Sequence, residues 1–356
     1  MNRAFLRSRW FRVGLGLVLI LLISATVILW LPNPQEGGAG VVVSIPRGAS
    51  FHAVVDSLKS AGAIRSSFSF QVAGRLLGYT KQIKVGKYLF APGMSNLDIL
   101  RDIREGKSRV IISVTIPEGW RMDAVVRKFS KELGLDEERL FAICTDTEYV
   151  RHKGLDGKSL EGYLLPDTYT FYWQTDEREV VDRMVDQFLD FYTDSLQERQ
   201  KELQMSRREI LTLASIVEAE SGLDDERQVI AGVYWNRLRR RMKLEADPTI
   251  QYALGSSPRR LTYRDLQTIS PYNTYRRYGL PPGPINNPGR KSILAALYPG
   301  QHQYLYFVAT GAGGHRFSRS FAEHQRAIRL YHQTRRQQRR ISVQQGVQSG
   351  SGVKNR

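Results

Sequence analysis

Residues 206–221 read SRREILTLASIVEAES, and this stretch sets the expected fold of the second half of the chain. Ser206 with Glu209 three residues later is a capping box, which predicts that a helix begins here. Apolar residues then occupy nearly every side of the helix from Ile210 to Val217. Because a helix that is apolar all round is buried, we expect it at the centre of a helix-rich domain.

The last turn of this helix carries two glutamates, Glu218 and Glu220. Successive helical residues turn by about 100°, so the two side chains point roughly 200° apart and do not share one site. Glu218 continues an apolar face of the helix, where burial would raise the pKa of its carboxyl group and suit it to general acid catalysis. The alternative is that one of these glutamates simply pairs with a nearby arginine, such as Arg227 or Arg237.

Residues 13–31 contain no charged side chain over 19 positions. A helix of this length spans roughly 28 Å, which nearly matches the hydrocarbon core of a bilayer. Arginines crowd the basic arm of residues 1–12, so the positive-inside rule predicts a cytoplasmic N-terminus. We expect a single-pass protein of the cell (inner) membrane, with its bulk periplasmic or otherwise extracytoplasmic. A cleaved signal peptide is the alternative, although no clear cleavage site precedes Pro32.

The remaining chain predicts an α+β fold. After a linker of residues 32–40, residues 41–150 have the order strand, helix, helix, strand, followed by further elements. Residues 151–333 change to long helices and loop-rich sections, with a minor sheet around Leu305 to Ala309. Residues 334–356 are basic and rich in Gln, Ser and Gly, a composition that predicts a disordered tail.

A short repeat links two parts of the first domain. Residues 46–55 (PRGASFHAVV) and 117–126 (PEGWRMDAVV) share Pro, Gly and the run Ala-Val-Val at the same offsets. This match predicts two turns of similar build, each of which leads into a helix.

The composition excludes some classes of protein. A hydrophobic share of 42% and a charged share of 24% are ordinary for a folded domain. The formal net charge of +17 suits nucleic acid, anionic lipid or an acidic polymer as partner. Nucleic acid is not expected, because the basic region is predicted to be exported and contains no known binding motif. With Cys144 as the sole cysteine, no internal disulfide forms.

Five motifs in the second half stand in a distinctive order: LASIVEAES (213–221), VYWNRL (233–238), EADPTIQYALG (245–255), SPYNTY (270–275) and GLPPGPINNPG (279–289). Together with LEGYLLPDTY (160–169), YFVATGAGGHRFS (306–318) and KVGKYLFAPGMSNLDIL (84–100), they resemble the YceG/MltG family of endolytic murein transglycosylases. The resemblance covers nearly all of residues 41–331.

The resemblance implies a LysM-like module within residues 41–150 and a catalytic domain in residues 151–333. It further implies cleavage of the MurNAc-GlcNAc β-1,4 bond of nascent glycan strands, which leaves 1,6-anhydroMurNAc ends and stops strand elongation. The first glutamate of the matched motif, Glu218, would act as acid and then as base, with Glu220 in support. Ordinary glycoside hydrolysis needs a second carboxylate, whereas this reaction does not. Glu220 as the acid is the second-ranked assignment.

Several other side chains are candidates to support the acid or bind the glycan. Amide and hydroxyl groups can hold sugar substituents, and aromatic faces suit stacking on sugar rings. These candidates are Asp247, Thr249, Asn273, Thr274, Tyr163, Tyr272, Tyr275 and His315. Structural duty in a turn is equally open for Asp247, which precedes a proline. The histidines show no ligand spacing, so we expect neither a metal nor a cofactor.

Two other functions remain open from the sequence. The chain could bind and scaffold the cell wall without cleaving it, or it could be a hydrolytic muramidase that uses Glu218 and Asp247. In each case the expected partners are peptidoglycan glycan strands and the membrane, and family analogy adds peptidoglycan synthases.

Overall fold

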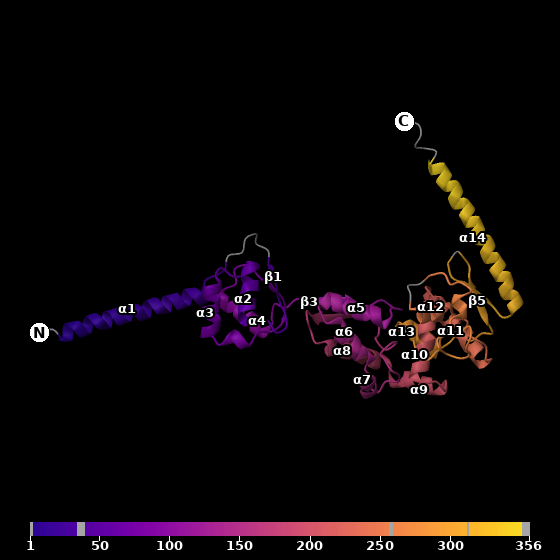
Figure 1. Cartoon of the computed structure of the whole chain (residues 1–356), viewed down its shortest axis with the longest axis horizontal. Coiled ribbons are helices and arrows are strands. Elements are labelled where there is room, and N and C mark those ends of the chain that lie inside the picture. Colours follow the sequence, from indigo (N-terminus) through magenta and orange to yellow (C-terminus); the bar gives the residue numbers. More distant parts are fainter. Residues whose placement is uncertain (1–2, 34–39, 256–258, 312, 351–356) are drawn as a thin grey trace. The chain divides into compact units, whose positions relative to one another are not determined.

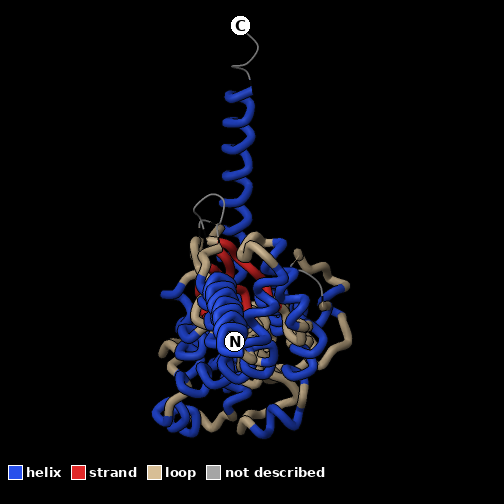
Figure 2. Tube along the Cα trace, turned by 90° about the vertical axis from the view of Figure 1, so that its left-hand side faces the viewer, coloured by secondary structure: helices blue, strands red, loops and turns tan. Residues whose placement is uncertain are grey.

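The computed structural model describes residues 3–33, 40–255, 259–311 and 313–350. Its elements are shown in Figure 1, and Figure 2 separates the helices from the short strands. The chain divides into two compact units: unit 1 contains Met1–Val114, Phe129–Leu135 and Thr170–Asp176, and unit 2 contains Thr115–Lys128, Asp136–Tyr169 and Glu177–Arg356. The chain contains both helices and short strands, which confirms the predicted mixture of the two.

Unit 1 contains the predicted order of strand, helix, helix and strand. The elements are β1 (Val41–Ile45), α2 (Phe51–Ser60), α3 (Ser67–Leu76), the short helix η1 (Tyr79–Lys81), β2 (Gly86–Phe90) and α4 (Asn96–Glu105). The strands β1 and β2 are antiparallel, with Val43 opposite Tyr88. Val55, Leu58 and Phe70 are fully buried between the sheet and the helices, so the apolar side of α2 faces the core.

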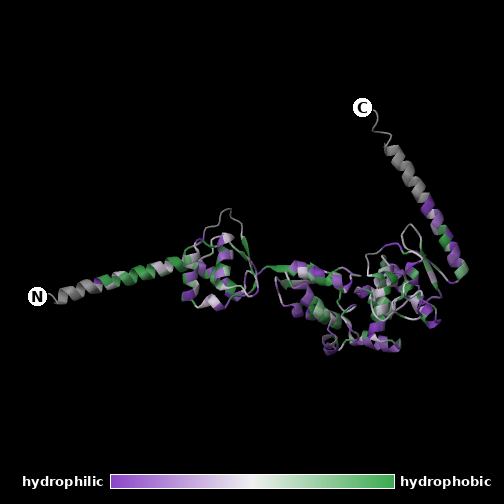
Figure 3. Ribbon diagram, viewed as in Figure 1, coloured by the Kyte–Doolittle hydropathy of each residue, from purple (hydrophilic) through white to green (hydrophobic). Residues whose placement is uncertain are grey.

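The helix α1 (Arg3–Trp30) contains the apolar stretch near the N-terminus. Among the described residues, its segment Arg12–Trp30 is the one helix long and apolar enough to cross a membrane. Figure 3 shows the hydrophobic colour along this segment. Asn33, within the linker predicted for residues 32–40, is 3% exposed, and its side-chain amide donates to the carbonyl of Met94 at 3.0 Å. Residues 34–39 of the predicted linker lie outside the described residues.

The two copies of the short repeat form the same local structure. Each contains a turn with a glycine in the left-handed region, Gly48 and Gly119, both with φ of +76°. Other residues rarely adopt this backbone conformation, which accounts for the shared glycine. The first turn leads into α2 and the second into α5 (Met122–Leu133), as the sequence predicts.

The boundary between the units differs from the one expected at residue 150. The strand β3 (Ile111–Thr115) pairs with β4 (Thr168–Tyr172), and the following helices α6 (Glu137–Thr145) and α7 (Thr147–His152) belong to unit 2. The reason is packing: α6 lies against α8 (Glu177–Phe191). In addition, the carbonyl of Cys144 accepts the backbone N–H of Leu160 at 2.9 Å.

The centre of unit 2 is α10 (Arg207–Glu220). Its residues from Ile210 to Val217 are all buried, and the capping box of Ser206 and Glu209 is present, so both predictions for this helix are confirmed. The helices that surround or precede it are α9 (Asp194–Glu202), α11 (Asp224–Arg239), α12 (Asp247–Leu254) and α13 (Arg290–Leu297), and η2 (Asp265–Gln267) lies in the loop after α12.

The C-terminal part contains the predicted minor sheet. Strands β5 (Tyr306–Ala309) and β6 (His315–Ser318) are antiparallel, and α14 (Phe321–Gly350) packs on both. The prediction of a disordered tail from residue 334 is wrong up to Gly350, because α14 continues through it. The segment 334–345 contains neither proline nor glycine, and its Gln and Arg residues are good helix formers. Residues 351–356 lie outside the described residues.

Candidate active site

The two glutamates at the end of α10 lie in different surroundings, as their spacing predicts. The side chain of Glu218 is 6% exposed and forms an ion pair with Arg227, whose side chain is 8% exposed. Arg227 Nη1 donates to Glu218 Oε1 at 3.0 Å, and the backbone N–H of Gly289 donates to Glu218 Oε2 at 2.9 Å. Both carboxylate oxygens are therefore occupied by fixed donors.

Arg227 is the centre of a wider polar cluster. It also contacts Asp224 at 3.2 Å, Glu118 at 3.5 Å and the hydroxyl of Ser292 at 2.8 Å. Burial, and then the charge of Glu218, raise the pKa of Glu118. The expectation of an apolar setting for Glu218 is wrong, because the structure shows the alternative, a pair with Arg227.

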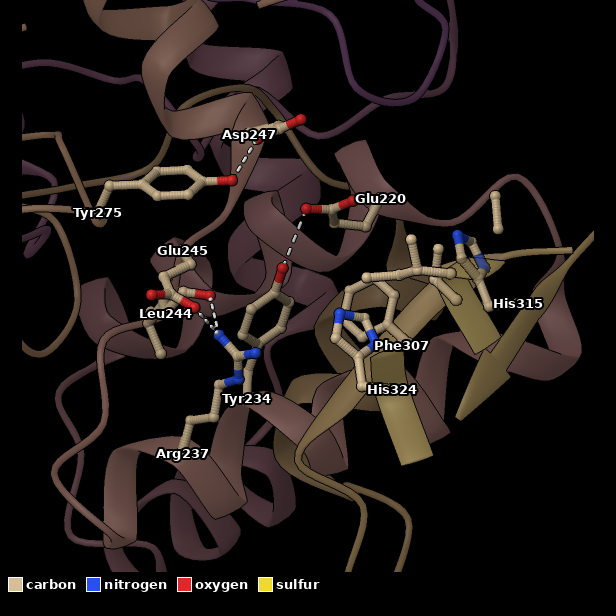
Figure 4. A pocket seen from close by; sticks show the side chains of 13 residues that line it. Glu220, Tyr234, Arg237, Leu244, Glu245, Asp247, Tyr275, Phe307, His315 and His324 are labelled. Atoms are coloured by element: carbon tan, nitrogen blue, oxygen red, sulfur yellow. Dashed lines mark hydrogen bonds and ion pairs between the residues drawn. The ribbon is translucent and has the colours of Figure 1, made fainter. Parts of the chain in front are cut away.

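Glu220 lines a pocket of about 550 Å³ in unit 2 (Figure 4). Tyr234 Oη donates to Glu220 Oε1 at 3.0 Å. Burial raises the pKa of Glu220 to about 7; the Tyr234 hydrogen bond and Arg237 oppose this rise, and the charge of Asp247 adds to it. A carboxyl group with this pKa is protonated in a large share of molecules near neutral pH, which is the state that a general acid needs.

Asp247 and Tyr275 form the opposite part of the pocket. Tyr275 Oη donates to Asp247 Oδ1 at 2.5 Å, and Figure 4 shows this pair facing the side of Glu220. Asp247 is the first residue of α12, with Pro248 after it. Asp247 and Tyr275, both predicted as site residues, therefore share the pocket with Glu220. Asp247 presents a carboxyl group there, and Tyr275 presents a phenol.

The polar candidates Thr249, Asn273 and Thr274 are buried in the supporting structure. The hydroxyls of Thr249 and Thr274 are 2.9 Å apart, and Thr274 Oγ1 also accepts the backbone N–H of Ala246 at 3.0 Å. Asn273 is 0% exposed, and its amide donates to two loop carbonyls, of which that of Thr268 is 2.7 Å away. These three residues hold the segments that carry Asp247 and Tyr275, and they do not line the pocket.

Of the three remaining candidates, His315 lines the pocket, whereas Tyr163 and Tyr272 do not. His315 lines the pocket, and its Nδ1 lies 2.6 Å from Glu226 Oε2. Tyr163 is 0% exposed and donates to the carbonyl of Asp156 at 2.9 Å, so it belongs to the core. The ring of Tyr272 packs against that of Tyr252 at 4.8 Å, outside this pocket.

Comparison with known proteins assigns the chain to a family. The model of the YceG-like family matches residues 43–330. The chain belongs to the YceG-like family. An endolytic murein transglycosylase of Bacillus subtilis is 31% identical over 315 residues, which cover 84% of this chain and 87% of the relative. An endolytic murein transglycosylase of Streptococcus pneumoniae is 29% identical, and the alignment covers 78% of this chain but 56% of that longer relative.

A solved structure supports the same family at the level of the fold. The crystal structure of a yceG-like protein of Listeria monocytogenes is 32% identical to this chain, with a TM-score of 0.58. The match covers 81% of this YceG-like chain and 98% of the Listeria chain.

Sequence reasoning did not select several residues that line the pocket of this YceG-like chain. These are Arg237, Leu244, Glu245, Phe307, Val308, Ala309, His324, Ile328 and Tyr234. Arg237 is held by Glu245 at 3.2 Å and by the carbonyl of Leu305 at 2.7 Å. The position of Glu245 two residues before Asp247 was an available signal for its place in the pocket. The packing of α14 beside β5 was not readable.

The described residues of this YceG-like chain contain no group of three or more His, Cys, Asp or Glu side chains arranged to hold a metal ion. Cys144 is a free thiol in the core, and burial raises its pKa to about 12. The pocket itself is lined by carboxyl, phenol, guanidinium and imidazole groups.

Proposed function

We propose that this YceG-like chain is an endolytic murein transglycosylase with Glu220 as its acid and base. The observation that carries the assignment is the state of the two glutamates: Glu220 opens into the pocket with a pKa of about 7, while Glu218 is held by Arg227 and Gly289. The names of the curated relatives supply the activity. This proposal exchanges the two glutamates relative to the expectation from the sequence.

The proposed reaction uses one carboxyl group twice. Protonated Glu220 gives its proton to the oxygen that joins MurNAc C1 to GlcNAc C4, and the C1–O bond breaks. The Glu220 carboxylate then accepts the proton of the MurNAc C6 hydroxyl as its oxygen bonds to C1. The product is a 1,6-anhydroMurNAc end, the carboxyl group is protonated again, and no water is consumed. Near-neutral acidity suits both halves of this cycle.

Other pocket residues supply orientation and charge. Tyr234 fixes one oxygen of Glu220, and Asp247 is engaged by Tyr275. The Asp247 carboxylate raises the pKa of Glu220 and would stabilise positive charge that develops on the sugar ring. Glu218 is assigned a supporting role, in which it joins the end of α10 to α11 and to the loop at Gly289.

A product analysis tests the reaction type. Uncrosslinked glycan strands incubated with the full chain in detergent should yield fragments that end in 1,6-anhydroMurNAc, identified by mass. Ends that are 18 Da heavier would show hydrolysis, and would assign Asp247 the second carboxylate's role, since it shares the pocket with Glu220. Bound but intact strands would indicate a scaffold protein and overturn the enzyme assignment.

The hydrogen bond from Tyr234 gives a second test. Tyr234→Phe removes an interaction that lowers the pKa of Glu220, so the pKa should rise further. Because the acid must be protonated, the alkaline fall in kcat/KM should move to higher pH. The maximum rate should drop by less than about tenfold, the usual worth of one neutral hydrogen bond. A pH–rate profile checks this, and an unmoved or acid-shifted alkaline limb would contradict it.

The location of the chain is proposed from charge and from the reaction. We assign α1 as a single membrane anchor, with the basic arm in the cytoplasm and both units on the outer side, where peptidoglycan lies. The strand–helix–helix–strand part of unit 1 is proposed as a LysM-like module that holds glycan. The proposed protein partners are the peptidoglycan synthases that extend the same glycan strands. The proposed role is to end the elongation of these glycan strands near the place where they are made.

A further inference from the structure

The helix α3 of unit 1 has an exposed apolar stripe. Phe68 is 74% exposed and Leu76 is 66% exposed, and Val72 between them is partly exposed. These positions are four residues apart, so they follow one side of the helix. Arg65 and Arg75 flank the stripe and are also exposed. Large apolar side chains with basic neighbours on one helix face are typical of helices that lie in a membrane interface.

This helix is tied to the C-terminal end of α1. Asn33 Oδ1 accepts the backbone N–H of Arg65 at 2.8 Å, and Asn33 Nδ2 donates to Asn96 Oδ1 at 3.1 Å. Asn96 Nδ2 in turn donates to the carbonyl of Ile28 in α1 at 2.8 Å. Asn33 and Asn96 are 3% and 5% exposed, so this network is part of the interior. The start of α3 is therefore held beside the point where α1 ends.

The length of α1 leaves little room between α3 and a bilayer. Its apolar segment of 19 residues spans roughly 28 Å, against a hydrocarbon core of about 30 Å. Yet Ile28 and Leu29, within that segment, already pack against the core of unit 1. If α1 crosses the membrane, the surface around its end lies at the headgroup level. That surface includes α3, which contacts α1.

We propose that α3 lies on the outer surface of the same bilayer that α1 crosses. Phe68 and Leu76 enter the boundary between headgroups and acyl chains, and Arg65 and Arg75 contact lipid phosphates. The proposal rests on the membrane anchoring proposed for α1, but not on the catalytic assignment. This contact of α3 with the bilayer fixes which face of unit 1 lies toward the lipid, and so restricts the rotation of unit 1 relative to the membrane.

Fluorescence quenching by lipid tests this proposal in the full chain. Phe68→Cys and Leu76→Cys are each labelled with a small environment-sensitive dye and reconstituted in phospholipid vesicles with or without lipids brominated near the headgroup. Native Cys144 stays in place, because it is 1% exposed and its raised pKa of about 12 makes it unreactive. The matched control is Leu89→Cys on β2, a 49% exposed apolar position. Its strand pairs with β1, which lies away from α1 in Figure 1.

Labels at positions 68 and 76 should be quenched at least about twofold more than the label at 89, since an interfacial helix buries its apolar face by 5–10 Å. Asn33→Ala should reduce quenching at 68, because it releases α3 from α1, and should leave the label at 89 unchanged. Equal quenching at 68 and 89 in inserted protein would overturn the proposal. So would excimers between pyrene labels at 68, which would assign the stripe to a second copy of the chain.

Glycan cleavage separates this proposal from the proposed function. The labelled positions lie in unit 1, whereas the candidate acid lies in unit 2. Quenching is therefore measured with the labelled chains and cleavage with the unlabelled chain, because the labelled positions lie in the proposed glycan-holding module. Loss of quenching with normal cleavage would reject only the membrane-facing stripe, and normal quenching without cleavage in the unlabelled chain would reject only the catalytic assignment.

Discussion

Glu220→Gln should lower the rate of glycan cleavage by about 10²–10⁴-fold, the usual contribution of a general acid or base. Glutamine keeps the shape of the side chain and an oxygen for the Tyr234 hydrogen bond, but it has no proton to give. The measurement is the initial rate of release of anhydro-ended fragments from uncrosslinked glycan. Binding of the glycan should change little, because the pocket keeps its other groups.

Glu218→Gln is the matched control on the same helical turn. It should retain cleavage within about tenfold, since Glu218 is not expected to touch the reacting bond. Its melting temperature should fall instead, because Arg227 loses the charge of its best-buried partner. The reverse pattern, with a dead Glu218→Gln and an active Glu220→Gln, would return the catalytic role to Glu218.

The raised pKa of Glu220 also affects stability. Below the ordinary value of 4.5, the carboxyl group is protonated in both the folded and the unfolded chain. Between 4.5 and about 7, the folded chain retains a proton that the unfolded chain has lost, so stability contributed at this site falls as pH rises. Glu220→Gln removes that loss, so it should not lower the melting temperature at neutral pH. Inactivity of this variant is then not explained by unfolding.

Arg227→Met should destabilise unit 2 by about 3–5 kcal/mol, because it leaves a buried carboxylate without its cation. The side chains of Arg227 and Glu218 are 8% and 6% exposed, so water screens their interaction little. Asp224 and Glu118 lose the same partner. The measurement is the denaturant midpoint of the unit 2 transition, followed with the full chain in detergent.

Arg127→Met provides the comparison for that variant. Arg127 and Asp123 are 2.8 Å apart, but their side chains are 57% and 42% exposed. An exposed ion pair of this kind contributes about 0–1 kcal/mol, so the midpoint should scarcely move. Equal effects of Arg227→Met and Arg127→Met would show that the cluster around Arg227 does not hold the end of α10.

The local features of α10 were predictable because they depend on neighbouring residues in the sequence. The capping box of Ser206 and Glu209 and the uninterrupted apolar run indicate where the helix begins and that it is buried. The helical repeat separates Glu218 from Glu220. The order of elements in the first part of unit 1 was also predictable, since local signals mark it: Ser50 and Ser95 cap the helices that follow them.

The difference in surroundings between Glu218 and Glu220 was not predictable by the same reasoning. It depends on Arg227 from α11 and on Gly289, which is 71 residues beyond Glu218, and no periodicity reports where these groups meet. Similarly, Thr249 and Thr274 are polar residues in conspicuous motifs, yet their hydroxyls satisfy each other inside the fold. The helical continuation of α14 was missed because a basic, Gln-rich composition is compatible with either a helix or a disordered tail.

The pairing of Glu218 with Arg227 limits how the family can vary at these two positions. Loss of Glu218 or Arg227 alone leaves the other buried charge unpaired, whereas replacement of both by apolar residues of similar volume is often tolerated. Among homologues, positions 218 and 227 should therefore covary, changing together or not at all. Glu220 is instead hydrogen-bonded by the phenol of Tyr234, and under the proposed function its identity should be set chiefly by the reaction.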